Sequence, residues 1–362
     1  MSRATTAVIH LPALRHNLRR VRQAAPGARV MAAVKANGYG HGQVRVARAL
    51  VDADGFAVAS IEEAVGLREA GITKPILLLE GIFEATELPL CSHLDLDIAL
   101  HHNSQLDMLE HARLKHPVRV WLKIDTGMHR LGLTPADVPQ TWRRLRECPA
   151  VVSDIHLMSH LARADERGAD YTLRQLRIFN ETTAGLPGER SLANSAGILG
   201  WPATHFDWVR PGLMFYGASP FVDSLAMDEG LQPAMTLATR LIAIKRLSKS
   251  EPVGYGGTWS CPEDMDVGVV AIGYGDGYPR QAPSGTPVLV NGREAALIGR
   301  VSMDMLSIDL RRHPEARVGD PVLLWGEGLP IEIIARSAST IPYTLMCGVT
   351  ARVHCQEHNG DE

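Results

Sequence analysis

The residue best placed for chemistry in this chain is a lysine that ends an apolar run and meets a glycine-rich turn. Lys35 follows a predicted strand at 30–34 and precedes Gly38, Gly40 and Gly42. A lysine that is shielded from water near other cations has a lowered pKa, so it can act as a base or form a Schiff base. Glycines let the backbone approach a ligand, and the N-terminus of a following helix favours an anion. Taken alone, the lysine is better explained as a snorkelling side chain, but the whole segment 34–42 favours a cofactor site.

A second group of polar side chains shares one face of a predicted strand. Alternation over residues 118–125 places Arg119, Trp121, Lys123 and Asp125 on the same face. Charges on the inner face of a barrel are costly unless they are paired. A structural ion pair is the general explanation for such a face, and a ligand site is the alternative.

Three further segments carry side chains that could act at the same site. His160 follows an apolar strand, Asn194 and Ser195 follow a short one, and Tyr255 lies in a glycine-rich loop. A histidine in this position is more often a hydrogen-bonded core residue, and a serine caps a helix as readily as it binds phosphate. A free tyrosine is a poor base at neutral pH because its pKa is near ~10. Tyr255 would therefore need nearby cations that favour its anion, and packing of its ring is the plainer explanation.

The elements that would position these residues alternate between strands and helices over the first two-thirds of the chain. Strands are predicted at 30–34, 56–59, 75–79, 94–100, 118–124, 151–157 and 191–192, and helices at 44–50, from 61 to a stop at Gly71, 105–115, 135–147 and 169–184. Repeated units of this kind require right-handed crossovers and a parallel sheet. About eight of them close into a (β/α)8 TIM-type barrel, although an open sheet fits the same pattern.

The sequence pattern changes after about Ser219. Short runs rich in Val, Ile, Leu and Thr occur at 236–244, 267–272, 287–291, 295–300, 305–310 and 321–325, separated by turn signals such as Asn291-Gly292 and Gly319-Asp320. We therefore expect a barrel in residues 1–225 and a mainly β domain in residues 226–362. The boundary is approximate, and part of the N-terminal strand can belong to the second domain.

Length and composition fit a cytoplasmic enzyme of two domains. The 362 residues are 45% hydrophobic, and a net charge of -3 argues against a nucleic-acid partner. No targeting signal opens the chain at Met1–Arg3, and no apolar stretch is long enough to cross a membrane. The five cysteines are odd in number and scattered, which is typical of free thiols in a reducing compartment. We expect a disordered tail rather than a metal site around His354, Cys355 and His358, and no metal elsewhere.

Taken together, these motifs resemble the bacterial alanine racemases, enzymes of fold-type III that depend on pyridoxal 5'-phosphate (PLP). The resemblance covers essentially the whole chain and is carried, in the order of the family, by residues 34–42, 122–132, 158–160, 194–195, 210–212, 253–259, 272–280, 299–304 and 342–343. It implies PLP as the cofactor and a homodimer with shared active sites. The implied reaction interconverts L-alanine and D-alanine by two-base proton transfer on the PLP external aldimine, for peptidoglycan or for alanine catabolism.

The resemblance also assigns the catalytic and cofactor-binding roles. Lys35 is implied to form the Schiff base and to take the proton of D-alanine, whereas Tyr255, contributed by the other subunit, takes the proton of L-alanine. The implied cofactor-binding residues are Lys35, Tyr39, Arg130, His160, Asn194, Ser195, Arg210, Gly212 and Tyr343. Among them, Tyr39, Ser195, Gly212 and Tyr343 belong to the phosphate side, His160 packs near the pyridine ring, and Arg210 faces the pyridine nitrogen.

The substrate is implied to meet a separate set of residues. Arg130 and the backbone of Met303 would bind its carboxylate, and Lys123 matches a lysine that is often carbamylated. The entrance channel would be lined by Asp165, Tyr274, Arg280 and Arg300.

Arg210 has a consequence for the kind of reaction. Arginine stays protonated in proteins, so it does not readily protonate the pyridine nitrogen as an aspartic acid would. The ring then remains a weaker electron sink. A short-lived carbanion suits racemisation, whereas a stabilised quinonoid would leak into transamination.

Three positions depart from the family pattern, and three other functions fit part of the sequence. His10 stands where Asp is common, Gly38 where Ala is frequent, and Thr344 where an acidic residue often follows the phosphate-side tyrosine. A racemase of other small amino acids, such as serine, fits the same motifs. A fold-type III decarboxylase would need a different phosphate segment, and a non-catalytic PLP-binding protein would resemble only the barrel.

Overall fold

The computed structural model describes residues 4–168 and 170–360, which form two compact units. The barrel unit contains Arg15–Phe215 and Pro220–Ser224. The β unit contains the chain up to Leu14, Tyr216–Ser219 and everything described from Leu225 onward. The opening residues 1–3, on which the expectation about a targeting signal rests, and residue 169 of a predicted helix lie outside the described residues.

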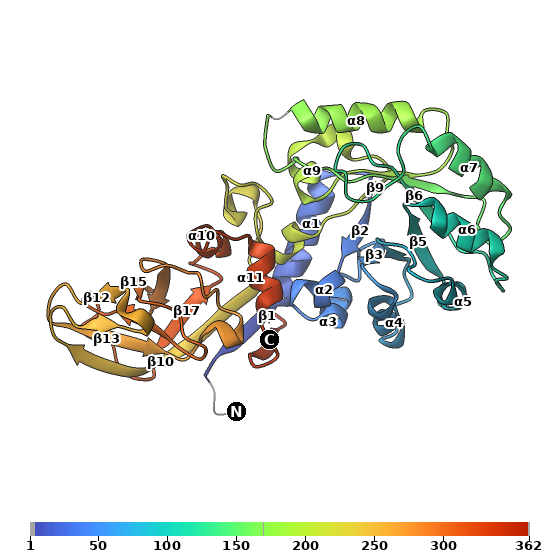
Figure 1. Ribbon diagram of the computed structural model, residues 1–362. Coiled ribbons are helices and arrows are strands. Elements are labelled where there is room, and N and C mark those ends of the chain that lie inside the picture. Colours follow the sequence, from blue (N-terminus) through green and yellow to red (C-terminus); the bar gives the residue numbers. More distant parts are fainter. Residues whose placement is uncertain (1–3, 169, 361–362) are drawn as a thin grey trace. The chain divides into compact units, whose positions relative to one another are not determined.

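Eight parallel strands close the barrel unit into a ring in chain order, which confirms the predicted (β/α)8 barrel (Figure 1). The strands are β2 (Arg29–Ala33), β3 (Gly55–Val58), β4 (Ile76–Leu78), β5 (Leu96–Leu100), β6 (Val120–Lys123), β7 (His156–Met158), β8 (Arg190–Ser191) and β9 (Trp208–Val209). The connecting helices are α2 (Lys35–Tyr39), α3 (Gln43–Ala49), α4 (Ile61–Glu69), α5 (Leu88–His93), α6 (Asn103–His111), α7 (Val138–Glu147), α8 (Asp170–Thr183) and α9 (Ser195–Gly200). The strand predicted at 151–157 was misplaced, because β7 starts at His156 and Val151 forms only an isolated bridge.

One layer of side chains fills the inside of this ring. It is built from Met31, Ala57, Leu77, Ala99, Trp121, Met158 and Trp208, one from each of seven strands. The layer combines two indoles and two methionines with two alanines, so the large side chains fill the space that the small ones leave. Because side chains alternate along a strand, the next inward position on β6 after Trp121 is Lys123, at the carboxyl end of the strand. Active sites of such barrels lie at this end.

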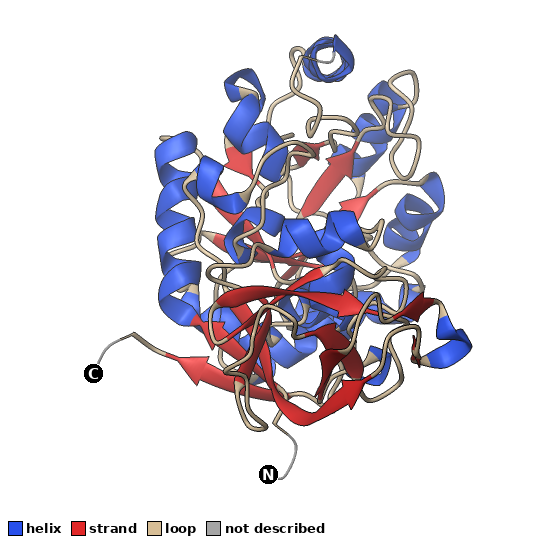
Figure 2. Cartoon of the chain, turned by 90° about the vertical axis from the view of Figure 1, so that its left-hand side faces the viewer, coloured by secondary structure: helices blue, strands red, loops and turns tan. Residues whose placement is uncertain are grey.

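The β unit consists mainly of strands, as predicted (Figure 2), and most of them pair in antiparallel fashion. Its strands are β1 (Thr6–His10), β10 (Met235–Leu247), β11 (Pro252–Val253), β12 (Trp259–Ser260), β13 (Met265–Val270), β14 (Pro287–Val290), β15 (Arg293–Ile298), β16 (Leu306–Asp309), β17 (Pro321–Trp325) and β18 (His354–His358), with helices α10 (Ile331–Ser337) and α11 (Pro342–Gly348). The long strand β10 pairs with both β17 and β13, so six strands form a closed circuit of pairings. Helix α1 (Leu11–Ala24) starts in this unit and continues into the barrel unit.

The C-terminal segment corrects one expectation. His354, Cys355 and His358, which were expected in a disordered tail, lie on β18, which pairs in parallel with β1. The position of His10 at the end of β1 explains part of this contact, since its ring packs edge-on against His358 with centroids 5.3 Å apart. Within residues 4–168 and 170–360, no group of three His, Cys, Asp or Glu side chains could hold a metal ion. In the same part of the chain, no helix is long and apolar enough to cross a bilayer.

Candidate active site

The lysine turn after β2 has an unusual backbone. Ala36, Asn37, Gly38 and Tyr39 all have positive φ angles, between 51° and 61°. Consecutive left-handed residues are costly for all residues except glycine, so the surroundings must hold this turn in place. The sequence predicted a glycine-rich turn after Lys35 followed by a helix at 44–50, which α3 confirms, but it did not predict that the turn is left-handed.

Glu63 on α4 stabilises this turn and was missed by the sequence interpretation. One of its carboxylate oxygens accepts the N–H of Ala36 at 2.7 Å and the other accepts the N–H of Ala59 at 2.8 Å. The pattern Ser60-x-x-Glu63 is that of a capping box, but Ser60 makes no capping hydrogen bond here. The capping-box pattern was therefore present in the sequence, but it predicts a hydrogen bond between Glu63 and the start of its own helix and gives no sign of the contact with Ala36.

A cradle of hydroxyl and amide groups follows β8 and β9. The hydroxyl oxygen of Ser195 accepts the N–H groups of Gly212 (3.0 Å) and Met214 (3.3 Å). Because the oxygen already accepts two hydrogen bonds, the hydroxyl group can donate its own hydrogen to a ligand. A methyl group on Gly212 would lie 2.6 Å from the hydroxyl oxygen of Tyr39, so the absence of a side chain allows this tyrosine to lie directly against the backbone.

Asn194, beside this cradle, has a structural role. Its side-chain oxygen caps α9 by accepting the N–H of Gly197 at 3.0 Å, and its amide donates to the carbonyl of Leu161 at 3.3 Å. The sequence left open whether the hydroxyl of Ser195 caps the helix or binds phosphate. In the structure, Asn194 caps the helix, and the hydroxyl of Ser195 accepts the N–H of Gly212 instead.

Lys123 lies among other cations at the carboxyl ends of the strands. Its side chain is buried and donates a hydrogen bond to the carbonyl of Leu79 at 3.2 Å. Burial, followed by repulsion from Arg210, Arg130 and Lys35, lowers its pKa to about 8, and Glu80 opposes this shift. About a tenth of the amine is therefore neutral at pH 7, and only the neutral amine can react with carbon dioxide.

The other polar residues on the Lys123 face of β6 do not join it. Arg119 forms an ion pair with Asp97 at 3.7 Å, and Asp97 accepts the indole N–H of Trp121 at 2.9 Å. Asp125 accepts the backbone N–H groups of Gly127 (2.9 Å) and His129 (3.0 Å), which shapes the loop that leads to Arg130. The face predicted from alternation is therefore real, but it is split between a structural ion pair, a buried lysine and a residue that shapes a loop.

Arg210, directly after β9, is buried and anchored at two points. Its guanidinium donates to the hydroxyl of Ser191 and to the carbonyl of Ser159. Burial lowers its pKa to about 10, which still leaves it protonated at neutral pH. Strand β9, which places this arginine, was absent from the predicted strands because a two-residue strand is too short for periodicity to reveal.

His160, the first residue after Ser159, is kept neutral. Burial, followed by repulsion from Arg210, Arg130, Lys123 and Lys35, holds its pKa well below the usual value. The same four cations therefore surround one neutral imidazole. The side chain of Arg130 is exposed in the single chain. Asp165 is half-buried and lies in the loop after β7.

In the β unit, Tyr255 lies at the tip of the hairpin formed by β11 and β12. Its side chain is 68% exposed. Gly254 and Gly256 flank it with positive φ angles, and a methyl group on Gly256 would come within 3.1 Å of the guanidinium of Arg300. The structure therefore brings Tyr255 and Arg300 close to each other.

Met303 and the entrance-channel residues of the β unit form a second group. The N–H of Tyr274 donates to the carbonyl of Ser302 at 3.0 Å, and the N–H of Gly275 donates to the carbonyl of Met303 at 2.8 Å. The guanidinium of Arg280 lies 6.0 Å from the centre of the Tyr274 ring. Met303 is 52% exposed.

Arg352 and Asp276 support this second group and were also missed. Asp276 is fully buried and accepts the N–H of Gly273 at 3.0 Å. Arg352 lies 3.6 Å from Asp276 and binds Asp304 at 2.6 Å, so it connects the two segments that carry Tyr274 and Met303. No motif marked Arg352, because its partners are distant in the sequence.

Tyr343 lies in the first turn of α11, where Pro342 starts the helix. Its side chain is 37% exposed, and the neighbouring Thr344 is exposed as well. The departure at Thr344 therefore changes a surface position of the β unit and leaves its core unchanged.

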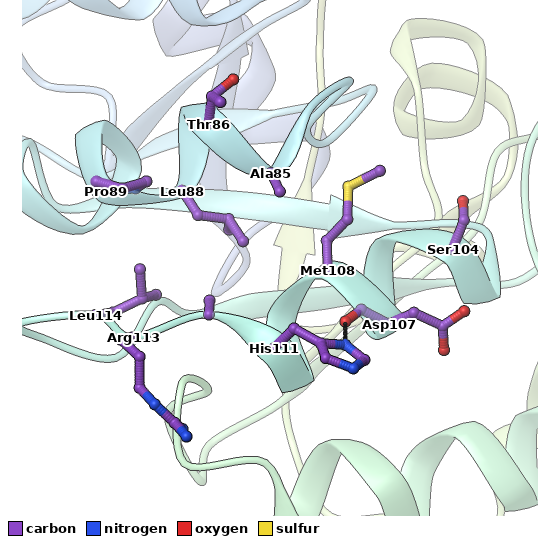
Figure 3. A pocket seen from close by; sticks show the side chains of 11 residues that line it. Ala85, Thr86, Leu88, Pro89, Ser104, Asp107, Met108, His111, Arg113 and Leu114 are labelled. Atoms are coloured by element: carbon purple, nitrogen blue, oxygen red, sulfur yellow. Dashed lines mark hydrogen bonds between the residues drawn. The ribbon is translucent and has the colours of Figure 1, made fainter.

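The barrel unit has another hollow, which contains none of the predicted site residues. It has a volume of about 620 Å³ and lies between the segment before α5 and helix α6. Figure 3 shows the side chains that line it, among them Leu88, Met108 and His111. Most of its lining is apolar, and its charged residues, Asp107 and Arg113, are of opposite sign, so it does not offer the cluster of cations found around Lys35.

Comparison with known proteins places the chain in a family. The family profile "Alanine racemase, N-terminal domain" matches residues 9–220, and "Alanine racemase, C-terminal domain" matches residues 234–356. The chain belongs to the alanine racemase family. Among its relatives, the biosynthetic alanine racemase of Escherichia coli is 54% identical over 97% of this chain and 98% of its own length. The alanine racemase of Nitrosococcus oceani is 57% identical over 96% and 97%.

Solved structures agree with this membership. The crystal structure of the biosynthetic alanine racemase from Pseudomonas aeruginosa has a TM-score of 0.96 and 48% identity, and covers 99% of this chain and 100% of its own. The alanine racemase from Acinetobacter baumannii has a TM-score of 0.93 at 36% identity and covers 98% and 100%. The resemblance found in the sequence motifs is therefore confirmed, together with the barrel and β domain it implied.

Proposed function

We propose that this member of the alanine racemase family interconverts L-alanine and D-alanine with PLP and supplies D-alanine for peptidoglycan. One observation carries the proposal. At the carboxyl ends of the barrel strands, Lys35 lies with three other cations, in the same unit as the cradle of Ser195, Gly212 and Tyr39. The names of the relatives, several of them biosynthetic, support the direction of the reaction in the cell.

The barrel residues fit an anionic, phosphate-bearing cofactor. The hydroxyl proton of Ser195 is left to donate to a phosphate, and Tyr39 lies directly against Gly212. The N–H of Gly212 already donates to Ser195, so it would share this hydrogen with the phosphate. Arg210 would donate to the pyridine nitrogen, and Tyr343 would contribute on the phosphate side. PLP supplies the electron withdrawal that makes the α-hydrogen of the bound amino acid acidic.

Racemisation requires one base on each face of the α-carbon. We assign the amine of Lys35 to the D-alanine proton and the phenol oxygen of Tyr255 to the L-alanine proton. In the L-to-D direction, Tyr255 removes the hydrogen from one face while Lys35 returns a proton to the other, and the reverse direction exchanges these roles. No atom is gained or lost overall. Arg130 and the backbone N–H of Met303 would hold the substrate carboxylate during both transfers.

We also propose that the protein works as a cytoplasmic homodimer whose sites are shared between subunits. The exposed Tyr255 and Met303 support this, because catalytic groups usually work shielded from water. The five cysteines are free, which fits a reducing compartment. A chiral assay with alanine, serine and larger amino acids tests the substrate: preference for serine or for a basic amino acid would overturn the assignment to alanine.

Mixing two inactive variants tests the shared sites. Lys35→Ala and Tyr255→Phe subunits are allowed to exchange at equal concentrations. If each site combines Lys35 of one subunit with Tyr255 of the other, half of the dimers are mixed and each contains one intact site, so about a quarter of the wild-type activity returns. Activity that stays at the level of the separate variants would contradict sharing. Unmixed variants and a wild-type sample treated in the same way serve as controls.

A further inference from the structure

Gln175 on α8 is a fully buried amide that uses both ends of its side chain. Its oxygen accepts the N–H of Ala162 at 2.8 Å. Its nitrogen donates to the carbonyl of His160 at 3.0 Å and to the hydroxyl of Thr126 at 3.2 Å. A buried amide is costly unless it is hydrogen-bonded, and this one connects the helix to two loops at the carboxyl ends of strands.

The connection continues from Thr126 to Arg210. The hydroxyl groups of Thr126 and Ser159 lie 2.8 Å apart, and the carbonyl of Ser159 accepts a hydrogen bond from Arg210. All four residues, Gln175, Thr126, Ser159 and Arg210, are buried. We call this set the Gln175 chain. It connects the outer helix to the arginine assigned to the pyridine nitrogen.

A neighbouring residue shows that burial on this face of α8 does not require such a connection. Thr172, one turn earlier, is also fully buried. Within the described residues, its hydroxyl has no hydrogen-bond partner. The helix therefore packs with an unsatisfied hydroxyl at Thr172, whereas every polar group of Gln175 is used toward the site.

We propose that Gln175 is a positioning residue for the reaction, acting through Thr126 and Ser159 on Arg210 and directly on His160. The inference rests on the proposed function, which places Arg210 at the pyridine nitrogen, and on the family resemblance, which places His160 near the pyridine ring. If the hydrogen bond between Arg210 and Ser159 is weakened, the guanidinium is held less well against the ring nitrogen. The extent to which the ring withdraws electrons from the α-carbon of the substrate then changes. Substrate binding depends on other residues and is left nearly unchanged.

The test compares two isosteric substitutions. Thr126→Val removes one link of the Gln175 chain, and Thr172→Val removes a buried hydroxyl that has no partner. We expect Thr126→Val to lower kcat about tenfold, the effect of one lost hydrogen bond, with KM for alanine within about twofold. The pH dependence of the visible absorbance of bound PLP should shift as well. Thr172→Val should leave all three unchanged.

A second variant separates positioning from folding. Gln175→Glu keeps the acceptor for Ala162 and removes at least one of the two donated hydrogen bonds, because a carboxyl group has at most one hydrogen to donate, so its kcat should fall at least as far as that of Thr126→Val. Melting of the cofactor-free proteins is measured for each variant. The proposal is overturned if both variants keep the kcat and the cofactor spectrum of the wild type, or if activity falls only in proportion to the loss of folded protein. Failure of the proposed function is distinct, because the wild type itself would then bind no PLP or leave alanine unchanged.

Discussion

The residues assigned to the reaction are held very differently in the two units. In the barrel unit, Arg210 and Ser195 are 5% and 3% exposed and make several hydrogen bonds to the surrounding backbone. In the β unit, Tyr255 and Met303 are 68% and 52% exposed. The residues of the barrel unit are therefore held in place by other residues of the same chain, whereas those of the β unit lie at a surface.

This difference indicates two kinds of contribution to catalysis. A buried, hydrogen-bonded set of cations is suited to holding an anionic cofactor in one orientation, because no reorganisation is needed when it binds. An exposed phenol becomes an effective base only after another surface excludes water from it. The comparison thus predicts that changes at the buried barrel residues act on the cofactor, and that a change at Tyr255 acts on turnover alone.

The largest expected effect is that of Lys35→Ala. The variant removes both the attachment of the cofactor and one base, so racemisation should fall by at least ~10⁴-fold. The visible absorbance band of the lysine-linked cofactor should disappear from its spectrum. Lys115→Ala, which changes an exposed lysine of the same unit, is the control and should keep both. A retained lysine-linked band in Lys35→Ala would remove Lys35 from its role.

Tyr255→Phe should leave the cofactor spectrum intact and lower racemisation by about 10²–10⁴-fold. Hydrogen exchange in deuterated water adds a sharper test of the two faces. Lys35 should still exchange the α-hydrogen of D-alanine without inversion, whereas L-alanine should keep its hydrogen; proton NMR measures both. Exchange of L-alanine at the wild-type rate would show that the faces are assigned wrongly.

Tyr278→Phe is the matched control for the phenol. Its hydroxyl is buried and, within the described part of the chain, has no hydrogen-bond partner. Removing it should therefore leave turnover unchanged and stability equal or slightly higher. A loss of turnover comparable to that of Tyr255→Phe would mean that any tyrosine change in the β unit disturbs the site.

The sequence predicted the elements and the reactive residues better than their supports. The carboxyl-end position of Lys35 and the alternation along β6 followed from hydrophobic patterning, which is local in the chain. Gln175, Glu63 and Arg352 were missed because each contacts residues more than twelve positions away. Single polar residues carry no periodicity that would reveal such partners.

Two errors in the fold have a related origin. Strand β9 is two residues long, and the polar strand β18 pairs with β1 through main-chain hydrogen bonds at the opposite end of the chain. Neither has a hydrophobic pattern. The left-handed turn after Lys35 was also not foreseen, because Ala36 and Tyr39 do not usually adopt positive φ angles.

Gly212→Ala should weaken cofactor binding while leaving the fold intact. The new methyl group would lie 2.6 Å from the Tyr39 hydroxyl, so the tyrosine or the backbone must move. We expect the Kd for PLP, measured by absorbance titration, to rise about 10–100-fold, which corresponds to an overpacking cost of about 1–3 kcal/mol. Gly66→Ala on α4, whose methyl group would lie 4.0 Å from the side-chain oxygen of Gln43, should bind PLP normally. Equal affinity in both variants would remove Gly212 from the phosphate cradle.

The smallest expected effect concerns stability, because the barrel half concentrates cations. Burial, together with Arg210, Arg130 and Lys35, lowers the pKa of Lys123 from 10.5 to about 8. Below pH 8 both the folded and the unfolded states carry the charge, so the folded state bears its full cost. Between pH 8 and 10.5 the folded state loses the proton first, and the cost declines. Lys123→Met should therefore stabilise the cofactor-free protein at pH 7 by about 1–2 kcal/mol.

Denaturant unfolding at several pH values in buffers free of carbon dioxide measures this gain, which should shrink from pH 8 and vanish above 10.5. Lys115→Met, at an exposed position, should show no such pH dependence. A gain that stays constant from pH 7 to 11 would contradict the buried cation as its cause. Added bicarbonate sharpens the comparison, because a carbamate on Lys123 would place a negative charge among these cations. The wild type should then gain stability while Lys123→Met does not, and a mass increase of one carbon dioxide on Lys123 would identify the modification.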